Sequence, residues 1–113
     1  MKNKLPKNSE KIKPLLLEFK TELAKIYKNN IKKSILFGSY ARGVFHSESD
    51  IDLLVVLEKP ENPYIEIERI SDIKFNFLLK YNINISCLFS DEKKFQQRLE
   101  PVYYNIMKEG III

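Results

Sequence analysis

The chain has 113 residues, 44% of them hydrophobic, and a formal net charge of +4, which bounds it to one domain with a single hydrophobic core. No apolar stretch approaches the roughly 20 residues that span a bilayer, and the first residues lack the apolar segment of a signal peptide, so no membrane partner is expected. The single cysteine, Cys87, excludes an internal disulfide and is expected to be a buried thiol in a reducing cytoplasm.

The first predicted element is an amphipathic helix near the N-terminus. Its apolar residues recur at helical spacing with Lys and Glu between them: Ile12, Leu16, Phe19, Leu23 and Ile26. Because proline is tolerated only near a helix start, we expect this helix to begin between Ser9 and Pro14. It is predicted to end near Asn29.

Positive charge is concentrated in this first part of the chain. Residues 1–33 contain ten Lys and three Glu, a balance of +7, so the remaining residues carry −3. The excess has two interpretations, a surface for nucleic acid or an acidic partner, and a solvated helix face. The second is favoured, because neither a basic segment interleaved with aromatic residues nor a helix-turn-helix pattern accompanies the charge.

Two apolar strands follow, with a glycine turn after the first. The strands are predicted at about Ile35–Phe37 and Ile51–Leu57, and residues 40–43 are predicted to form a short helical turn. Residues 58–63 read as a loop by composition. Tyr40 in the turn either stacks on a ligand or packs beneath the turn, and packing is favoured.

The second half of the chain alternates helix, strand and helix. A helix is predicted at about Tyr64–Tyr81, with one apolar face made of Ile67, Ile70, Phe77 and Tyr81. A third strand is predicted over Ile83–Phe89, and Ser90 is the expected N-cap of the next helix. A final helical stripe, interrupted at Pro101, consists of Phe95, Leu99, Val102, Tyr103 and Ile106. The predicted class is α+β, a small mixed sheet flanked by helices.

The second strand begins with two carboxylates, Asp50 and Asp52, that need a counter-charge. Residues i and i+2 of a strand project from one face, and their Cα atoms lie roughly 6.5 Å apart. Two like charges at the mouth of a buried strand repel each other and resist desolvation. The pair is therefore predicted to hold Mg²⁺, which accepts one or two protein carboxylates and completes its shell with water and phosphate oxygens. Taken alone, such a pair is more often a solvated strand end.

The glycine turn offers the complementary groups for phosphate. Gly38 permits a tight turn, and Ser39 supplies a hydroxyl and a backbone N–H at the start of the helical turn. Arg42 has two interpretations, a bidentate phosphate contact or an ion pair that holds the loop. Gly38, Ser39 and Arg42 are the predicted nucleotide-binding residues, and Asp50 and Asp52 the predicted catalytic and metal-binding residues.

The spacing of these motifs resembles that of a known enzyme superfamily. Gly38-Ser39 and, ten residues later, Asp50-Ile51-Asp52 are similar to the signature of the DNA polymerase β-like nucleotidyltransferases. The size and surroundings resemble the minimal nucleotidyltransferases (MntA-like antitoxins), and the likeness covers nearly the whole chain. It implies a polymerase β-like core in a single domain, residues 1–113.

The resemblance also implies a third carboxylate on the strand beside the Asp pair, and here the chain departs from the pattern. The matching position is predicted to be Asn84, and Ser86 is the other polar residue on that face. An Asn carbonyl can ligate a metal but adds no charge and takes no proton at neutral pH.

The resemblance implies a Mg²⁺-dependent transfer of a nucleoside monophosphate, with AMP from ATP favoured, to a protein acceptor. The implied acceptor is a HEPN-domain toxin, inactivated when a tyrosine is AMPylated. The rival interpretation is a protein that binds nucleotide or a toxin without catalysis, because the third acid is missing. Nucleic acid as the acceptor is disfavoured, and the oligomeric state is left open.

Overall fold

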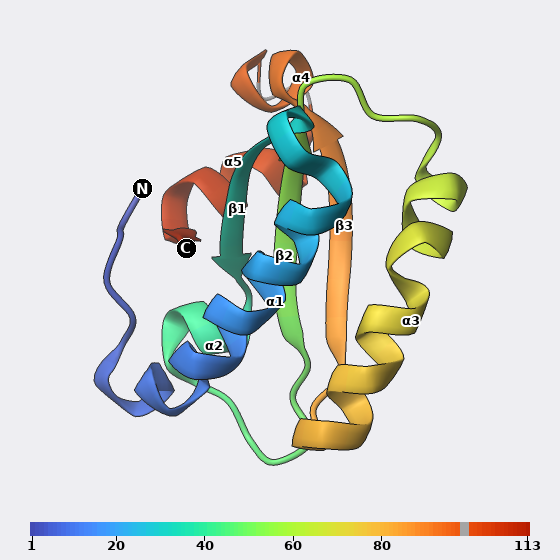
Figure 1. Ribbon diagram of the computed structural model, residues 1–113. Coiled ribbons are helices and arrows are strands. Elements are labelled where there is room, and N and C mark those ends of the chain that lie inside the picture. The colour runs from blue at the N-terminus through green and yellow to red at the C-terminus, as the bar shows by residue number, and fades with distance from the viewer. Residues whose placement is uncertain (98–99) are drawn as a thin grey trace.

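Residues 1–97 and 100–113 of the chain are described by a computed structural model (Figure 1). The α-helices are α1 (Lys13–Tyr27), α2 (Ser39–Arg42), α3 (Pro63–Tyr81), α4 (Glu92–Gln97) and α5 (Pro101–Glu109). Two short 3₁₀ helices, Lys7–Ile12 and Lys28–Asn30, flank α1. The strands are β1 (Ile31–Phe37), β2 (Ile51–Leu57), β3 (Ile85–Asp91) and β4 (Ile111–Ile112). Leu99, which the sequence placed on the last helical stripe, lies outside the described residues.

The strands form a mixed sheet in the order β3-β2-β1-β4. β1 pairs antiparallel with β2 and with β4, whereas β2 and β3 are parallel. Parallel neighbours need a long crossover, and α3 provides it between β2 and β3 (Figure 1). The mixed sheet flanked by helices confirms the α+β class predicted from the sequence.

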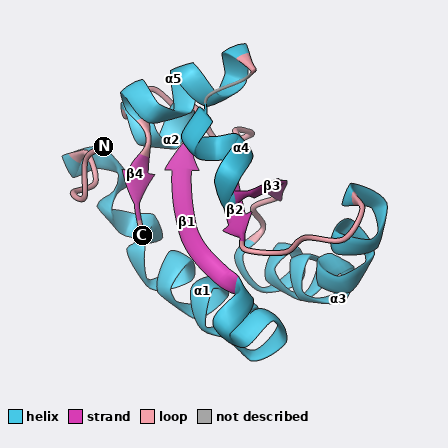
Figure 2. Cartoon of the chain, turned by 90° about the horizontal axis from the view of Figure 1, so that it is seen from above, coloured by secondary structure: helices cyan, strands magenta, loops and turns pink. Residues whose placement is uncertain are grey.

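The central strand β2 is buried on both faces, which explains its unbroken apolar run. One face packs against α1 and α3 through Leu53, Val55 and Leu57. The other face, with Leu54 and Val56, packs against Phe95, Tyr103 and Ile106 of α4 and α5. Figure 2 shows α1 and α3 on one side of the sheet and α5 on the other. This sandwich fixes the start of β2, where the two aspartates lie.

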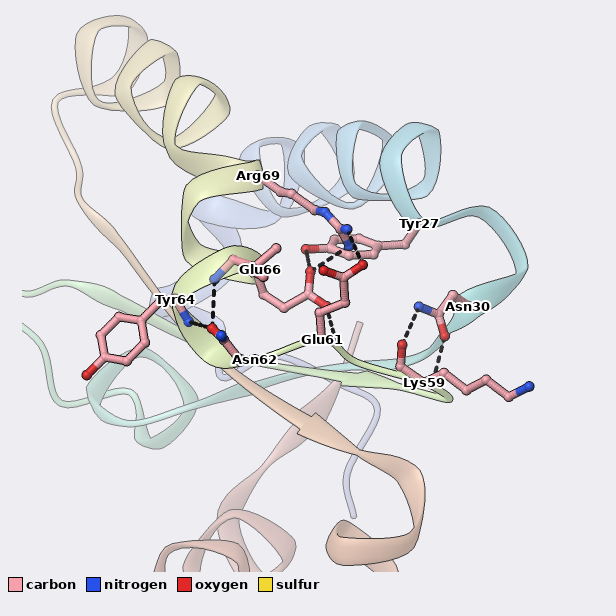
Figure 3. Close-up of polar contacts among 9 residues, drawn as sticks. Tyr27, Asn30, Lys59, Glu61, Asn62, Tyr64, Glu66 and Arg69 are labelled. Carbon is pink, nitrogen blue, oxygen red and sulfur yellow. Dashed lines mark hydrogen bonds and ion pairs between the residues drawn. The ribbon is translucent and has the colours of Figure 1, made fainter.

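A buried carboxylate, Glu66, joins α3 to the end of α1 (Figure 3). It accepts hydrogen bonds from the Tyr27 hydroxyl at 3.0 Å, from Arg69 Nη1 at 3.1 Å and from the Glu61 amide at 2.9 Å. Burial, and then the hydrogen bond to Glu66, raise the pKa of Tyr27. Asn62 caps α3 by accepting from two amides of its first turn. The cluster is structural and lies away from the two aspartates.

Some predicted boundaries needed correction, and β3 spans Ile85–Asp91 rather than Ile83–Phe89. β1 begins at Ile31 rather than Ile35, because its first half pairs with the end of β2 although Lys32, Lys33 and Ser34 interrupt the apolar run. Ser90 belongs to β3 and does not cap α4. Instead, the Asp91 carboxylate accepts from the amide of Lys94 at 2.6 Å.

Among the described residues of the predicted apolar stripes, three are exposed, and one of them is Val102 on α5, at 36%. Ile67 is 47% exposed, because the face of α3 that meets the sheet carries Glu66, Ile70 and Phe77. Ile26 is 36% exposed, and the neighbouring Tyr27 takes the buried place in the last turn of α1. The rest of each stripe is largely confirmed, because Leu16, Phe19 and Leu23 of α1 and Ile70 and Phe77 of α3 are buried. None of the helices in residues 1–97 and 100–113 combines the length and apolar character needed to cross a bilayer.

Candidate active site

The turn after β1 is held in one conformation by glycine and by packing. Gly38 has φ 75° and ψ −155°, a region in which side-chain-bearing residues are strained. Its carbonyl accepts from the amides of Ala41 and Arg42, both at 3.1 Å, and so closes the turn of α2. Tyr40 is buried and stacks on Phe45 with ring centroids 4.1 Å apart, so the packing interpretation of Tyr40 is confirmed.

The glycine turn lies directly against one of the two aspartates. Phe37, the last residue of β1, pairs with Asp52 in the antiparallel register. A Cβ added to Gly38 would lie only 2.2 Å from Oδ2 of Asp52. The turn that the sequence predicts to bind phosphate and the predicted metal-binding carboxylate of Asp52 are therefore in contact, and the contact requires glycine.

Asp50 and Asp52 lie at the start of β2 and differ in exposure. Asp50 is exposed and precedes the strand, whereas Asp52 is half-buried within it. Burial raises the pKa of Asp52, the charge of Asp50 raises it further, and the charge of Arg42 opposes the rise. The two carboxylates thus repel each other in a partly desolvated place, a situation that a bound cation relieves.

Arg42 forms an ion pair across the fold. Its Nη1 donates to both carboxylate oxygens of Glu109 on α5, at 3.1 and 3.3 Å. The structural role that the sequence left open is therefore present, and the phosphate role stays a prediction. Glu109 was not singled out from the sequence, because a partner 67 positions away leaves no local signal.

The parallel register identifies the residue beside Asp52 on the neighbouring strand. Asp52 pairs with Ser86 of β3, so both side chains project from the same face of the sheet. Asn84, the predicted third position, precedes β3, and its carbonyl accepts from the amide of Ile51 at 2.9 Å. It also borders a hollow with residues of α3, including Ser71 and Lys74. The register thus places Ser86 level with Asp52. Neither Ser86 nor Asn84 is an acid.

The donor set suits a hard divalent cation held in part by its substrate. In the described ranges 1–97 and 100–113, no group of three or more His, Cys, Asp or Glu side chains is placed to hold a metal. Two neighbouring carboxylates, one with a raised pKa, are nevertheless the ligand number with which Mg²⁺ is commonly bound when phosphate and water complete its shell. The residues present therefore fit Mg²⁺ with a phosphate-bearing substrate.

The connector between turn and strand is held by its own polar groups. The His46 carbonyl accepts from the Ser49 amide at 3.0 Å, and the His46 amide donates to Ser49 Oγ at 3.0 Å. The imidazole Nδ1 of His46 accepts from the Glu48 amide at 3.2 Å. His46 is therefore engaged in shaping the loop that leads to Asp50.

Comparison with known proteins adds independent findings. The family model described as "Nucleotidyltransferase domain" matches residues 16–113. A Methanocaldococcus jannaschii protein, MJ0604, provisionally named a protein adenylyltransferase, is 35% identical over 97 residues, covering 85% of this chain and 91% of its own. A second protein of that organism, MJ0141, with the same provisional name, is 41% identical over 73 residues, or 64% of this chain and 72% of its own.

Solved structures share the fold at lower identity. A provisionally named nucleotidyltransferase from Sulfolobus solfataricus superimposes with a TM-score of 0.64 at 23% identity, covering 93% of this chain and 81% of its own. A toxin-antitoxin complex solved with AMP-PNP contains a chain with a TM-score of 0.53 at 18% identity, covering 84% of this chain and 69% of its own. These two likenesses establish the fold alone.

Proposed function

The chain belongs to the family defined by the nucleotidyltransferase domain, and from this membership we propose that it transfers AMP from ATP to a hydroxyl group of a protein. The observation that carries the proposal is the contact between Gly38 and Asp52. It joins a turn suited to phosphate to a carboxylate whose environment calls for a cation.

In this scheme the turn and the carboxylates hold opposite parts of one substrate. Ser39 would donate to the terminal phosphates, and Asp50 and Asp52 are the residues that would hold a divalent cation. A cation there supplies charge neutralisation at the phosphate oxygens. The acceptor oxygen attacks the α-phosphorus in line, a P–O bond forms, and the bond to the β-phosphate bridging oxygen breaks. Pyrophosphate leaves, and the hydroxyl proton passes to solvent or to a group of the acceptor.

The proposed acceptor is a protein toxin. The curated relatives carry provisional names as protein adenylyltransferases, and two structural neighbours come from toxin-antitoxin complexes, one of them named MntA-HpeT. The resemblance to MntA-like antitoxins implies a HEPN-domain protein with a modifiable tyrosine. A phenol is an intrinsically acidic hydroxyl, so transfer to a tyrosine would depend least on a general base.

A second candidate function is binding without catalysis. It is favoured by the residues of β3, because Ser86 lies level with Asp52 and Asn84 precedes the strand. Loss of a general base typically costs about 10²–10⁴-fold in rate, which need not abolish transfer. The intact Asp pair favours the enzyme.

Labelled ATP separates the two candidates. The purified chain would be incubated with Mg²⁺, ATP labelled at the α-phosphate and extract of its own host, beside an Asp50→Asn/Asp52→Asn control. A labelled protein band that needs the Asp pair is the expected result, and its mass identifies the acceptor. Binding of Mg·ATP without any labelled band, with acceptor present, would favour the non-catalytic candidate.

A further inference from the structure

A cationic hollow lies beside α2, on the side of the N-terminal segment. It has a volume of about 380 Å³ and is lined by Lys2, Lys4 and Arg42, together with Leu5, Pro6 and Ile111. Its volume lies within the range of small-molecule sites, roughly 300–1,000 Å³. Three cationic side chains from two distant parts of the chain therefore meet around one open space.

The position of the N-terminal segment is fixed by hydrogen bonds. The Lys2 amide donates to the Gly110 carbonyl at 3.2 Å, and the Lys2 carbonyl accepts from the Ile112 amide at 2.9 Å. Lys2 thereby extends the sheet beyond β4 as an isolated bridge. The backbone that carries Lys2 is thus held at the hollow, although its side chain is exposed.

The next residues tie the same segment to α2. Asn8 Nδ2 donates to the Gly43 carbonyl at 2.6 Å, and Ser9 Oγ donates to the Tyr40 carbonyl at 2.6 Å. Both contacts cross from the N-terminal segment to the turn that follows Gly38. The lysines and Arg42 are therefore positioned relative to the candidate active site by a common framework.

The charge of the hollow favours an anion. Glu109 is the acid paired with Arg42, and both hydrogen bonds between them use the single guanidinium nitrogen Nη1. Counting Lys2, Lys4, Arg42 and Glu109, the group carries a formal excess of two positive charges. Arg42 is also near enough to the carboxylates that its charge opposes the rise in the pKa of Asp52. The hollow thus shares Arg42 with the residues proposed to bind phosphate.

We propose that Lys2 and Lys4 form, with Arg42, a subsite for the terminal phosphates of the nucleoside triphosphate, so that the N-terminal segment is part of the substrate site. This inference rests on the proposed function and extends it, because neither lysine belongs to the Gly38-Ser39 or Asp50-Asp52 motifs. The two lysines add charge-assisted contacts to the part of the substrate that departs as pyrophosphate. Nucleotides with a longer phosphate tail are therefore held more tightly.

The direct probe is inorganic tripolyphosphate, which has the phosphate tail without base or ribose. Its affinity would be measured by titration calorimetry without divalent cations, for the wild-type chain, for Lys2→Ala/Lys4→Ala and for Lys93→Ala/Lys94→Ala. The last variant removes the same charge from exposed positions on α4, at the opposite end of the sheet from α2 (Figure 1). We expect Lys2→Ala/Lys4→Ala to weaken binding at least about fivefold, and the α4 control less than about twofold.

Two results of these titrations would overturn the proposed subsite. One is the absence of tripolyphosphate binding by the wild-type chain, and the other is an equal loss of affinity in the two double variants. A single-stranded oligonucleotide that loses more affinity than tripolyphosphate in Lys2→Ala/Lys4→Ala would assign the lysines to nucleic acid instead. Tripolyphosphate binding through the lysines without any AMP transfer would uphold the subsite and contradict the proposed function. AMP transfer with an unchanged KM for ATP in Lys2→Ala/Lys4→Ala would contradict the subsite and uphold the proposed function.

Discussion

Gly38 and Asp52 are in contact at the junction of β1 and β2, where a Cβ on the glycine would lie 2.2 Å from a carboxylate oxygen. The conformation of Gly38 and the position of Asp52 are consequently interdependent. A motif that reads in sequence as two separate signals, a turn and an acidic pair, is one packed unit. The predictions below follow from that unit and from the structure that supports it.

Replacement of Gly38 should damage both stability and the site. Gly38→Ala introduces strain at φ 75° of about 1–3 kcal/mol and pushes the Asp52 carboxylate from its place. Gly43→Ala is the matched control, because it also has a positive φ, 73°, but contacts Asn8 and Pro6 instead of Asp52. The midpoint of thermal unfolding and the rate of Mg²⁺-dependent transfer should both fall in Gly38→Ala. Gly43→Ala should also lose stability, but it should lose less of the transfer rate. Equal transfer rates in the two folded variants would contradict the coupling.

The ionised Asp52 should destabilise the chain when no cation is bound. Its folded-state pKa is raised above the ordinary value of 3.8, so the folded state holds the proton more tightly than the unfolded state. The stabilisation from that proton is present at low pH and is lost as pH rises through the raised pKa. Asp52→Asn should therefore be more stable than wild type near pH 7 without divalent cations, and the difference should shrink as pH falls.

Urea denaturation measures this difference at several pH values, from about pH 4, near the ordinary pKa of Asp, to about pH 8. Asp72→Asn, which removes an exposed carboxylate on α3, controls for net charge. Saturating Mg²⁺ should stabilise the wild type more than Asp52→Asn, because only the former retains both carboxylates. A destabilised Asp52→Asn at neutral pH without cations would contradict the electrostatic account.

A third carboxylate should strengthen the cation site only at the position level with Asp52. Ser86→Asp places an acid beside Asp52 in the parallel register, whereas Asn84→Asp places one before β3 begins. Ser86→Asp is expected to lower the Mg²⁺ concentration for half-maximal transfer and to raise the rate, by up to about 10²-fold if it also acts as a base. Asn84→Asp should change neither by more than about twofold. The opposite ranking would support Asn84 as the third position.

The buried Glu66 should contribute to stability and leave the chemistry intact. Glu66→Gln weakens the contacts with Tyr27 and Arg69 and should cost about 1–3 kcal/mol of unfolding free energy. Glu68→Gln, exposed on the same helix, is the control and should change stability by less than about 0.5 kcal/mol. Denaturation midpoints give the comparison, and transfer rates of the two folded variants should agree. A selective loss of transfer in Glu66→Gln would show that the cluster reaches the active site.

Local patterns predicted the central part of the fold well. The apolar run Ile51–Leu57 is a strand with the expected bounds, because burial on both faces leaves no polar position in it after Asp52. The turn at Gly38 and the placement of Asp50 and Asp52 at the mouth of that strand also followed from local sequence. These features depend on residues close in the chain.

The features that sequence could not supply depend on register and on distant contacts. The level of Ser86 beside Asp52 is set by how β3 pairs with β2, and one residue of slip would have changed the face. Glu109 and Lys2 reach the neighbourhood of Arg42 only because β4 and the N-terminal segment pair at the sheet edge. Likewise, the exposure of Ile67 on α3 accompanies the burial of the neighbouring polar Glu66, which no hydrophobic period reveals.

The most direct test of the central claim compares two positions of the label in ATP. With Mg²⁺ and an acceptor protein identified from host extract, the account predicts label on the acceptor from the α-phosphate and none from the γ-phosphate. It also predicts release of pyrophosphate and complete dependence on Asp50 and Asp52. Transfer of the γ-label, or transfer of the α-label that persists in Asp50→Asn/Asp52→Asn, would contradict the claim that these carboxylates drive nucleotidyl transfer.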